Sequence, residues 1–288
     1  MAHVAQKAVS EINGADMRSI IATMVIPRFY VPQPLTVGQC ISLPEAVANH
    51  AVRVLRLQPG DSLVLFNGEG GAYAGRLAER DIAPKAPTPK KQRDARSGRQ
   101  TVADVILEEF QPDDRASCLQ VSLWQGVSAA ERMNYTWQKS VELGVHRCVP
   151  IETRRCVTKL DAARAEKRHA HWQGVIVSAA EQCGLNRLPE LVPVQTLTQA
   201  LAMPVGSGVR VMLDPDATES FPVWLERQQG ITDLTILIGP EGGFAPEEIT
   251  AAQAAGFLCF RLGPRVFRTE TAGPVALAVT QAIAGDLR

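Results

Sequence analysis

Residues 237–244, Leu-Ile-Gly-Pro-Glu-Gly-Gly-Phe, are the most distinctive stretch of the 288-residue sequence. The apolar run that ends at Ile238 predicts a buried strand, and Pro246 fits the first turn of a helix that follows the glycines. Glycines at such a turn let a ligand approach bare backbone groups at the carboxyl end of a strand, where open α/β sheets bind ligands. The spacing matches neither the dinucleotide pattern Gly-x-Gly-x-x-Gly nor the nucleotide phosphate loop. The stretch therefore predicts either a tight turn or a ligand site of another kind.

A second glycine-marked segment follows about twenty residues later, at 262–272: Leu-Gly-Pro-Arg-Val-Phe-Arg-Thr-Glu-Thr-Ala. Arg265, Arg268 and Glu270 cluster beside the turn that the Gly-Pro pair forces. Thr269 is expected to cap the last helix. Two such loops after neighbouring strands, one neutral and one charged, predict a pocket for a polar cofactor beside an anionic substrate.

Around these loops the sequence alternates short apolar strands with helical stretches, which is typical of an α/β domain. Gly144 is expected to end the first helix, and Pro246 to begin a later one. The expected strands are 119–124, 148–151, 209–213, 234–238 and 258–262, and the expected helices are 131–143, 161–183, 246–255 and 271–284.

The preceding region, 24–112, has short β-type runs broken by proline and glycine, and we expect a small β-barrel interrupted by one helix over 44–55. A loop at 84–100 carries six basic residues against Asp94 alone and has no apolar periodicity, so we expect it to be mobile. Residues 1–23 precede a second methionine, Met24, and are expected to form a mobile extension. The expected domains are thus 24–112 and 118–288.

Composition narrows the class of protein. The chain is 45% hydrophobic, and thirty Lys and Arg balance thirty Asp and Glu, which excludes a polybasic binder and an acidic scaffold. The six cysteines form no Cys-x-x-Cys pair, so we expect neither a metal site nor disulfides, and a reducing cytoplasm fits best. No apolar run reaches the length of a membrane helix, and we expect no membrane association.

Five motifs together resemble the ribosomal RNA small-subunit methyltransferase E family. They occur in the order expected for that family, and the resemblance spans about Met24 to Ala284. The motifs are Val54-Leu-Arg-Leu-Gln-Pro-Gly-Asp61, Gln138-Lys-Ser-Val-Glu-Leu-Gly-Val145, Glu181-Gln-Cys-Gly184, Ile238-Gly-Pro-Glu-Gly-Gly-Phe244 and the 262–272 segment.

This resemblance implies an N-terminal PUA-like RNA-binding β-barrel and a C-terminal SPOUT methyltransferase domain with a trefoil knot, working as a homodimer. The implied reaction is methylation of uridine N3 in 16S rRNA with S-adenosylmethionine, on free rRNA or on the assembled small ribosomal subunit. Two alternatives remain: a SPOUT-type methyltransferase that acts on another RNA site, and a non-catalytic RNA-binding protein.

The resemblance also assigns site residues. Glu270 is the expected base for the uracil N3 proton and Arg268 the expected clamp for the developing anion or a phosphate, although an Arg-Glu pair can simply hold the loop. The expected cofactor-binding residues are Leu213, Ile238, Gly239, Pro240, Glu241, Gly242, Gly243, Leu262, Gly263, Val266, Phe267, Arg268 and Thr271.

Basic side chains outside that pocket are the expected RNA contacts, with an ordinary solvated face as the alternative. They are Arg53, Arg56, Lys90, Lys91, Arg93, Arg155 and Arg187. The sequence departs from the family pattern at Leu185, where arginine is expected, and at Phe267, where leucine is usual.

The last helix predicts assembly. Between Pro274 and Ala284 its only polar side chains are Thr280 and Gln281, so it lacks the polar face of an ordinary surface helix. Its own sheet can cover only one side. We therefore expect a second copy of the chain to cover another side, in a closed dimer whose seam runs beside the cofactor pocket.

Overall fold

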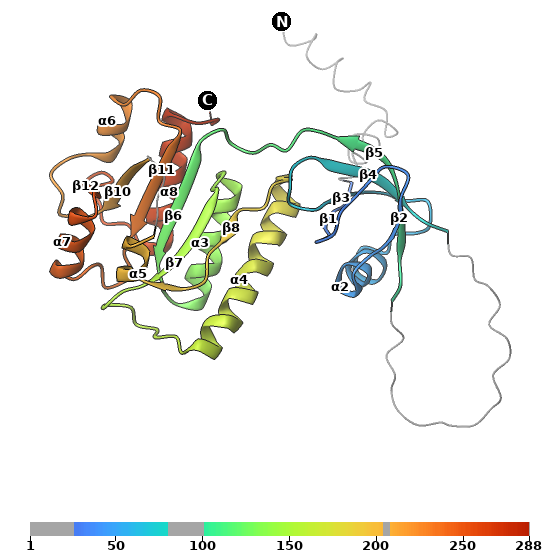
Figure 1. Cartoon of the computed structure of the whole chain (residues 1–288), viewed down its shortest axis with the longest axis horizontal. Coiled ribbons are helices and arrows are strands. Elements are labelled where there is room, and N and C mark those ends of the chain that lie inside the picture. The colour runs from blue at the N-terminus through green and yellow to red at the C-terminus, as the bar shows by residue number, and fades with distance from the viewer. Residues whose placement is uncertain (1–25, 80–100, 204–207, 288) are drawn as a thin grey trace, which may run out of the picture. The chain divides into compact units, whose positions relative to one another are not determined.

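The computed structural model describes residues 26–79, 101–203 and 208–287 (Figure 1). The expected extension at 1–23 and the basic loop at 84–100 lie outside the described residues. The chain divides into two compact units: the first is built mainly from residues before Gln111, and the second from Gln111 onward together with the short segments 32–34 and 66–72. The division lies close to the expected domain boundaries, which themselves stay a prediction.

The first unit is a five-stranded sheet. Successive side chains along its strands point alternately into the core and away from it: Val105 and Leu107 are buried, whereas Ile106 between them is 45% exposed. The strand order is β1-β3-β4-β5-β2, with β1 at Arg28–Tyr30, β2 at Cys40–Ser42, β3 at Ser62–Phe66, β4 at Ala72–Leu77 and β5 at Asp104–Gln111.

The helix expected over 44–55 forms with an unexpected ending. It begins as α2 at Glu45–Asn49 and continues as a π-helical turn at His50–Val54, where the Leu55 amide donates to the His50 carbonyl at 2.9 Å. Apolar periodicity cannot distinguish these two windings, because both present one face to the core. The wider turn leaves Val54 66% exposed, and Arg56 follows in the left-handed region with φ of 59°.

The second unit is a parallel sheet with helices on both faces, which confirms the α/β prediction. Its main strand order is β12-β10-β11-β6-β7-β8, and β9 also pairs with β7. The strands are β6 at Gln120–Gly126, β7 at Arg147–Glu152, β8 at Glu190–Leu191, β9 at Gln195–Thr196, β10 at Val209–Leu213, β11 at Asp233–Ile238 and β12 at Leu258–Phe260.

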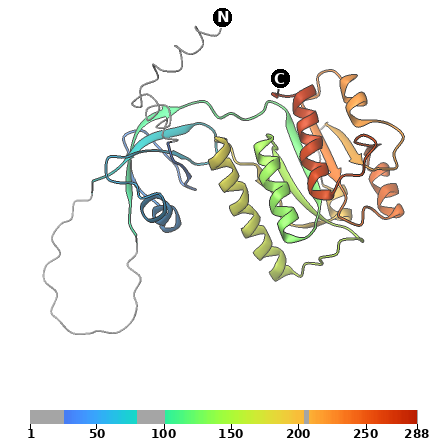
Figure 2. The same cartoon turned by 180° about the vertical axis from the view of Figure 1, so that it is seen from behind.

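Three helices, α3, α4 and α8, lie across one face of this sheet (Figure 2). Helices α5 and α7 pack with the core of the other face, and α6 contacts α8. The bounds are α3 at Ala130–Glu142, α4 at Ala162–Cys183, α5 at Leu197–Leu201, α6 at Phe221–Glu226, α7 at Pro246–Ala254 and α8 at Thr269–Ile283.

Four elements were not expected from the sequence: β8, β9, α5 and α6. Each spans between two and six residues, which is too short for a hydrophobic period to be visible. Helix α5 nonetheless carries a local signal, because Thr196 and Gln199 form a capping box at its start.

Strand β6 fixes which side chains reach which face of the sheet. Trp124 belongs to the core on the α5 and α7 side, whereas Leu123 and Gln125 meet Gly273 of α8 on the opposite side. Because all the strands are parallel, the carboxyl ends of β6, β10 and β11 lie at one edge of the sheet.

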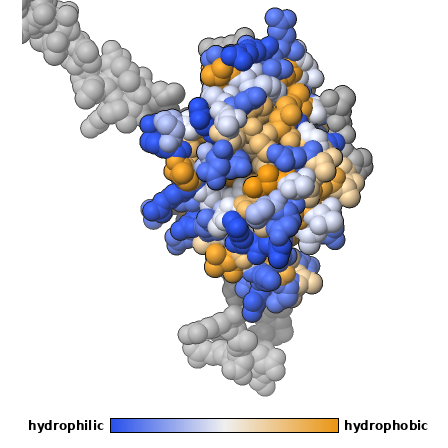
Figure 3. All heavy atoms as spheres, turned by 90° about the vertical axis from the view of Figure 1, so that its left-hand side faces the viewer, coloured by the Kyte–Doolittle hydropathy of each residue, from blue (hydrophilic) through white to orange (hydrophobic). Residues whose placement is uncertain are grey.

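Some apolar surface remains at the end of the sheet where α6 and α7 lie. Figure 3 shows that face, with apolar residues gathered between polar ones; Val223 on α6 and Leu258 on β12 are among the exposed apolar side chains. Within the described ranges, no helix combines the length and the apolar character that crossing a membrane requires.

Candidate functional site

A cavity of about 640 Å³ opens at the carboxyl edge of the parallel sheet. It lies between the loops that follow β10, β11 and β12. Every residue expected to bind a cofactor lines it except Thr271, which lies within the first turn of α8. This volume is in the range of sites for small organic ligands and cofactors.

The first wall of the cavity, residues 239–243, is a tightly packed backbone loop. A Cβ on Gly239 would lie 3.2 Å from the Phe244 ring, and Gly243 has φ of 66°, a conformation that L side chains rarely adopt. Gly126 at the end of β6 packs against the loop so closely that an added Cβ would lie 2.7 Å from the Pro240 ring. These glycines bring bare backbone to the cavity.

Arg155 supports the same wall from the loop after β7. Its Nη1 donates to the Gly242 carbonyl at 3.2 Å, and a Cβ on Gly242 would lie 3.0 Å from the Arg155 Cβ. Arg155 was expected to contact RNA; the structure places it at the cavity, where its side chain is still exposed.

The second wall, residues 262–268, is far more exposed. Gly263 turns the chain with φ of 82°, Val266 is 78% exposed, and Arg265 and Arg268 are exposed as well. Phe267, where the family usually has leucine, is half-buried and keeps an apolar side chain at the cavity. This wall presents side chains rather than backbone.

Thr269 does not cap α8, and that prediction was wrong. Arg268 occupies the N-cap position, and Thr269 is the first helical residue. Its hydroxyl donates instead to the Gly239 carbonyl at 2.6 Å and accepts a hydrogen bond from Gln125 Nε2 at 2.8 Å. The side chain is used to connect the two walls, because the turn directs it toward the first wall rather than along the helix.

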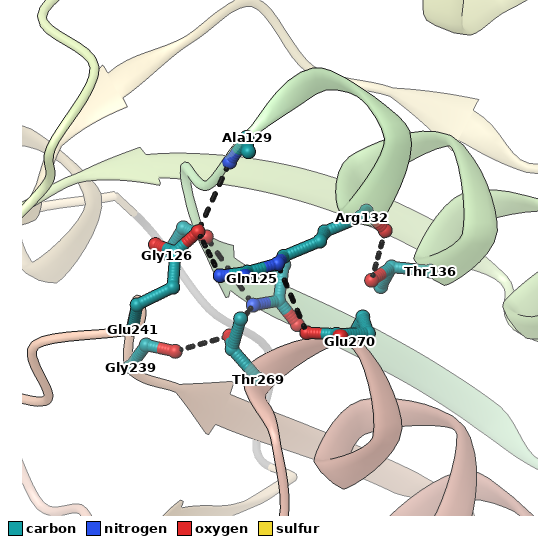
Figure 4. A network of polar contacts seen from close by, with 9 residues as sticks. All are labelled: Gln125, Gly126, Ala129, Arg132, Thr136, Gly239, Glu241, Thr269 and Glu270. Carbon is teal, nitrogen blue, oxygen red and sulfur yellow. Dashed lines mark hydrogen bonds and ion pairs between the residues drawn. The ribbon is translucent and has the colours of Figure 1, made fainter.

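An arginine on α3 connects the charged groups of both walls (Figure 4). Arg132 Nη1 lies 2.7 Å from Glu241 Oε1, and its Nε lies 3.8 Å from Glu270 Oε2. Glu241 also accepts a hydrogen bond from the Ala129 amide at 3.1 Å. Glu241, Glu270 and the start of α3 therefore form one network beside the cavity.

Glu270 and Arg268 line the cavity as expected, and Arg155, which was expected outside the pocket, lines it too. The other expected RNA contacts lie elsewhere. Arg53 and Arg56 are exposed residues of the first unit, and Lys90, Lys91 and Arg93 lie outside the described residues.

Arg187 has a structural partner. Its Nη2 lies 3.1 Å from Asp114 Oδ2. The hydrogen bond from the Ala116 backbone amide is the largest effect on Asp114, and it lowers the pKa of this carboxyl. Burial raises that pKa by less than the amide lowers it, and the Arg187 guanidinium lowers it further. Leu185, where the family has arginine, is buried, so this position supplies no cation.

Several residues of the site were not predicted from the sequence, notably Gln125, Arg132 and Asp214. Arg132 and Asp214 line the cavity, and Gln125 lies behind it with its side chain fully buried. None of the three belongs to a glycine-marked loop, and only the fold brings them to the cavity. The parallel order of β6, β10 and β11 is the signal that could have found them, because it places the residues after each strand at one edge.

Cysteine and metal chemistry have no support at this site. Burial raises the pKa of the Cys148, Cys156 and Cys259 thiols, which disfavours the nucleophilic thiolate. All six cysteines are free. Within the ranges that the structure covers, no group of three or more His, Cys, Asp or Glu side chains is arranged to hold a metal ion.

Two family models match the chain. The model described as an RNA methyltransferase domain matches residues 115–281, and the one described as an RNA methyltransferase PUA domain matches residues 43–81. The first contains every residue that lines the cavity, and the second lies mostly within the first unit.

Similar proteins carry consistent names. The chain is 30% identical to ribosomal RNA small subunit methyltransferase E of Buchnera aphidicola over 91% of this chain and 98% of that protein. It is 32% identical, with a TM-score of 0.78, to the crystal structure of ribosomal RNA small subunit methyltransferase E from Neisseria gonorrhoeae bound to S-adenosyl methionine, over 91% of this chain and 100% of that one. A methyltransferase from Legionella pneumophila in complex with the cofactor SAM is 33% identical, with a TM-score of 0.79, over 91% and 99% of the two chains.

Proposed function

The chain belongs to the ribosomal RNA small subunit methyltransferase E family, and from this membership we propose that it transfers a methyl group from S-adenosylmethionine to N3 of a uridine in 16S rRNA. The observation that carries the proposal is the cavity itself. Both glycine-marked loops line it, and they meet at one edge of the sheet. We also retain the SPOUT trefoil knot as part of this proposal.

The residues of the cavity fit this cofactor. Gly239 and Gly243 offer a backbone cradle that side chains would fill, so main-chain groups can read the edges of an adenine. Asp214 at the carboxyl end of β10 offers a carboxylate for hydroxyl or ammonium groups. When bound, the cofactor supplies an electrophilic methyl group, and the protein supplies orientation. We propose the thirteen residues named above as its binding set.

The chain must also produce a nucleophilic uracil. Glu270 is the proposed base: its carboxylate would take the proton from N3. Arg268, exposed at the N-cap of α8, would hold the developing anion or an adjacent phosphate. Arg132 keeps the Glu270 carboxylate beside the cavity through their 3.8 Å ion pair.

The proposed partner is 16S rRNA, free or in the assembled small subunit. The PUA-domain match in the first unit supports RNA binding there. Arg53 and Arg56 flank the exposed Val54 and Leu55 at the π-helical turn, which combines positive charge with apolar surface. Lys90, Lys91, Arg93, Arg155 and Arg187 complete the proposed contacts, and we propose a cytoplasmic location, where this RNA is found.

A homodimer is proposed from helix α8. Its polar residues Thr280 and Gln281 are fully buried, and Gln281 Nε2 donates to the Leu143 carbonyl at 3.1 Å. The side that remains accessible carries Val275, Val279 and Ala282. An ordinary surface helix buries its apolar side and exposes its polar side. This part of α8 does the reverse, and the exposed apolar stripe is where we propose that a second copy packs.

Val279→Glu tests the dimer by placing a charge on that stripe. We expect monomers, seen by sedimentation at working concentration, and loss of methylation. Glu226→Gln on α6 is a control that changes charge away from the stripe. A fully active monomer, wild type or variant, would contradict the proposed assembly.

The catalytic proposal is tested by cofactor binding and methyl transfer together. S-adenosylmethionine should raise the melting temperature, because a ligand that binds only the folded state stabilises it. Transfer of label to 16S rRNA should follow. Binding of RNA without any effect of the cofactor would instead favour a non-catalytic RNA-binding protein, and label in another RNA would favour a methyltransferase of different specificity.

A further inference from the structure

Gln125 lies behind the cavity with its side chain completely buried. Its Nε2 donates to Thr269 Oγ1 at 2.8 Å and to the Gly126 carbonyl at 3.2 Å. Its Oε1 is buried and accepts no hydrogen bond from any described residue. A buried acceptor without a donor costs about 1–3 kcal/mol, so a native protein rarely keeps one without a use.

The orientation of this amide is fixed by its neighbours. The Thr269 hydroxyl has a single proton, which it donates to the Gly239 carbonyl at 2.6 Å. Thr269 Oγ1 can therefore only accept from Gln125, and the amide nitrogen must face it. Exchanging the nitrogen and oxygen of Gln125 would set two acceptors against each other, so Oε1 must point the other way.

On that other side lies the Glu270 carboxylate. Figure 4 shows the Gln125 side-chain oxygen pointing toward it. Gly273, one turn after Glu270 on α8, is so close that an added Cβ would lie 3.2 Å from Gln125 Oε1. Glu270 Oε2 is itself buried and receives no hydrogen bond within the described ranges, since Arg132 Nε stays at 3.8 Å. Both oxygens are therefore buried without a hydrogen-bond donor among the described residues.

A proton on Glu270 removes this defect. The carboxylic acid has an O–H donor, whereas the carboxylate has none, so protonation would let Glu270 donate to Gln125 Oε1. Only the carboxylic acid can use Gln125 Oε1 as a hydrogen-bond acceptor.

We propose that Gln125 is a positioning residue that accepts a hydrogen bond from Glu270 after this carboxylate has taken the uracil N3 proton. The N–H bond of the uracil would break and leave its electron pair on N3, and the proton would form an O–H bond on Glu270. That pair would bond to the methyl carbon as the carbon–sulfur bond breaks with its electron pair left on sulfur. The proton leaves to solvent when the product departs. This inference rests on the proposed role of Glu270 as the base.

Three variants separate this role from simple packing. Gln125→Met keeps the size of the side chain and removes the acceptor. Gln125→Glu supplies a carboxyl group that can share a proton with Glu270. Thr269→Ser keeps the hydroxyl that orients the Gln125 amide and removes only a methyl group, so it serves as the matched control for packing.

The first readout is single-turnover methylation of 16S rRNA across pH at saturating cofactor. Gln125→Met should lower the plateau rate about tenfold or more and move the acid limb of the profile to lower pH. Gln125→Glu should move that limb to higher pH, because two close carboxyl groups retain a shared proton. Thr269→Ser should leave the limb unchanged, whatever its effect on cofactor affinity.

The second readout needs no turnover. Carbon-13 NMR of labelled glutamate, with the Glu270 signal assigned by Glu270→Gln, reports the protonated fraction at mildly acidic pH. That fraction should fall in Gln125→Met and rise in Gln125→Glu. Unchanged limbs and fractions in both variants would overturn the role of Gln125. Wild-type turnover in Glu270→Gln would instead overturn the proposed base, which distinguishes the two failures.

Discussion

The two walls of the cavity are held in opposite ways. Residues 239–243 are fixed by close backbone packing against Gly126 and Arg155, whereas residues 262–268 are exposed along most of their length. Thr269 connects them through its bond to Gly239. The first wall is suited to recognising one rigid ligand through main-chain groups, and the second offers charged side chains to a larger substrate.

This difference predicts which substitutions should weaken cofactor binding and which should slow methyl transfer. Changes behind the first wall should damage cofactor affinity, because the backbone there has no room to relax. Changes in the second wall and at the start of α8 should damage the transfer step, because those side chains face the substrate. Predictions that separate affinity from rate therefore test the comparison directly.

The largest expected effect is that of Gly126→Ala. The added methyl carbon would lie 2.4 Å from the Pro240 nitrogen, so the backbone of the first wall must shift. We expect S-adenosylmethionine affinity to fall about a hundredfold or more, as geometry in such a site tolerates little displacement. Calorimetry measures it, with Gly174→Ala, which has open space around it, as the control. Equal affinity in both variants would mean that the first wall does not bind the cofactor.

Arg268→Ala and Glu270→Gln should act in the opposite sense. Methylation should slow by about a hundredfold, and by clearly more than cofactor affinity falls, because general-base and electrostatic contributions are of this size. Single-turnover rates and calorimetry on the same preparations give both quantities. A loss of affinity that matches the loss of rate would make these residues structural supports of the loop.

Gly242→Val should have a smaller effect than Gly126→Ala. A Cβ at Gly242 meets the Arg155 Cβ at 3.0 Å and the Arg155 carbonyl oxygen at 3.1 Å, and relieving these contacts takes a smaller shift than relieving those at Gly126. We expect cofactor affinity to fall about tenfold, with Arg155→Gly in the same chain recovering part of the loss by removing the opposing Cβ. No recovery in the double variant would locate the damage elsewhere in the loop.

The smallest expected effect concerns Asp114. Its pKa lies below the ordinary value of an aspartate, chiefly because the Ala116 amide donates to it and also because Arg187 pairs with it. A lowered pKa stabilises the fold above the unfolded pKa, and that contribution disappears as pH falls through the folded value. Asp114→Asn should cost about 1 kcal/mol or less near neutral pH and nothing at pH values well below the lowered pKa. Urea unfolding at both pH values measures this, and a cost that persists in acid would exclude the charge as its source.

Apolar periodicity predicted the α/β domain and its long helices. The glycine-marked loops together with the family resemblance predicted much of the cavity lining. Neither signal predicted Gln125 or Arg132, since a residue on a central strand and one at the start of a helix become neighbours of α8 only through the sheet order. Thr269 was predicted to be a cap, because local rules cannot anticipate a bond to Gly239, thirty residues away. The π-helical turn after Asn49 was not predicted for a similar reason, because its apolar pattern is that of an ordinary α-helix.

The most direct test of the account is mass-spectrometric mapping of methylated uridines in 16S rRNA from cells with and without this protein, repeated with purified protein and S-adenosylmethionine. The account predicts one N3-methyluridine that is absent from cells lacking the protein and restored by the wild-type chain but not by Gly126→Ala. An identical set of modified uridines in both cell types, with no transfer by the purified protein, would contradict it.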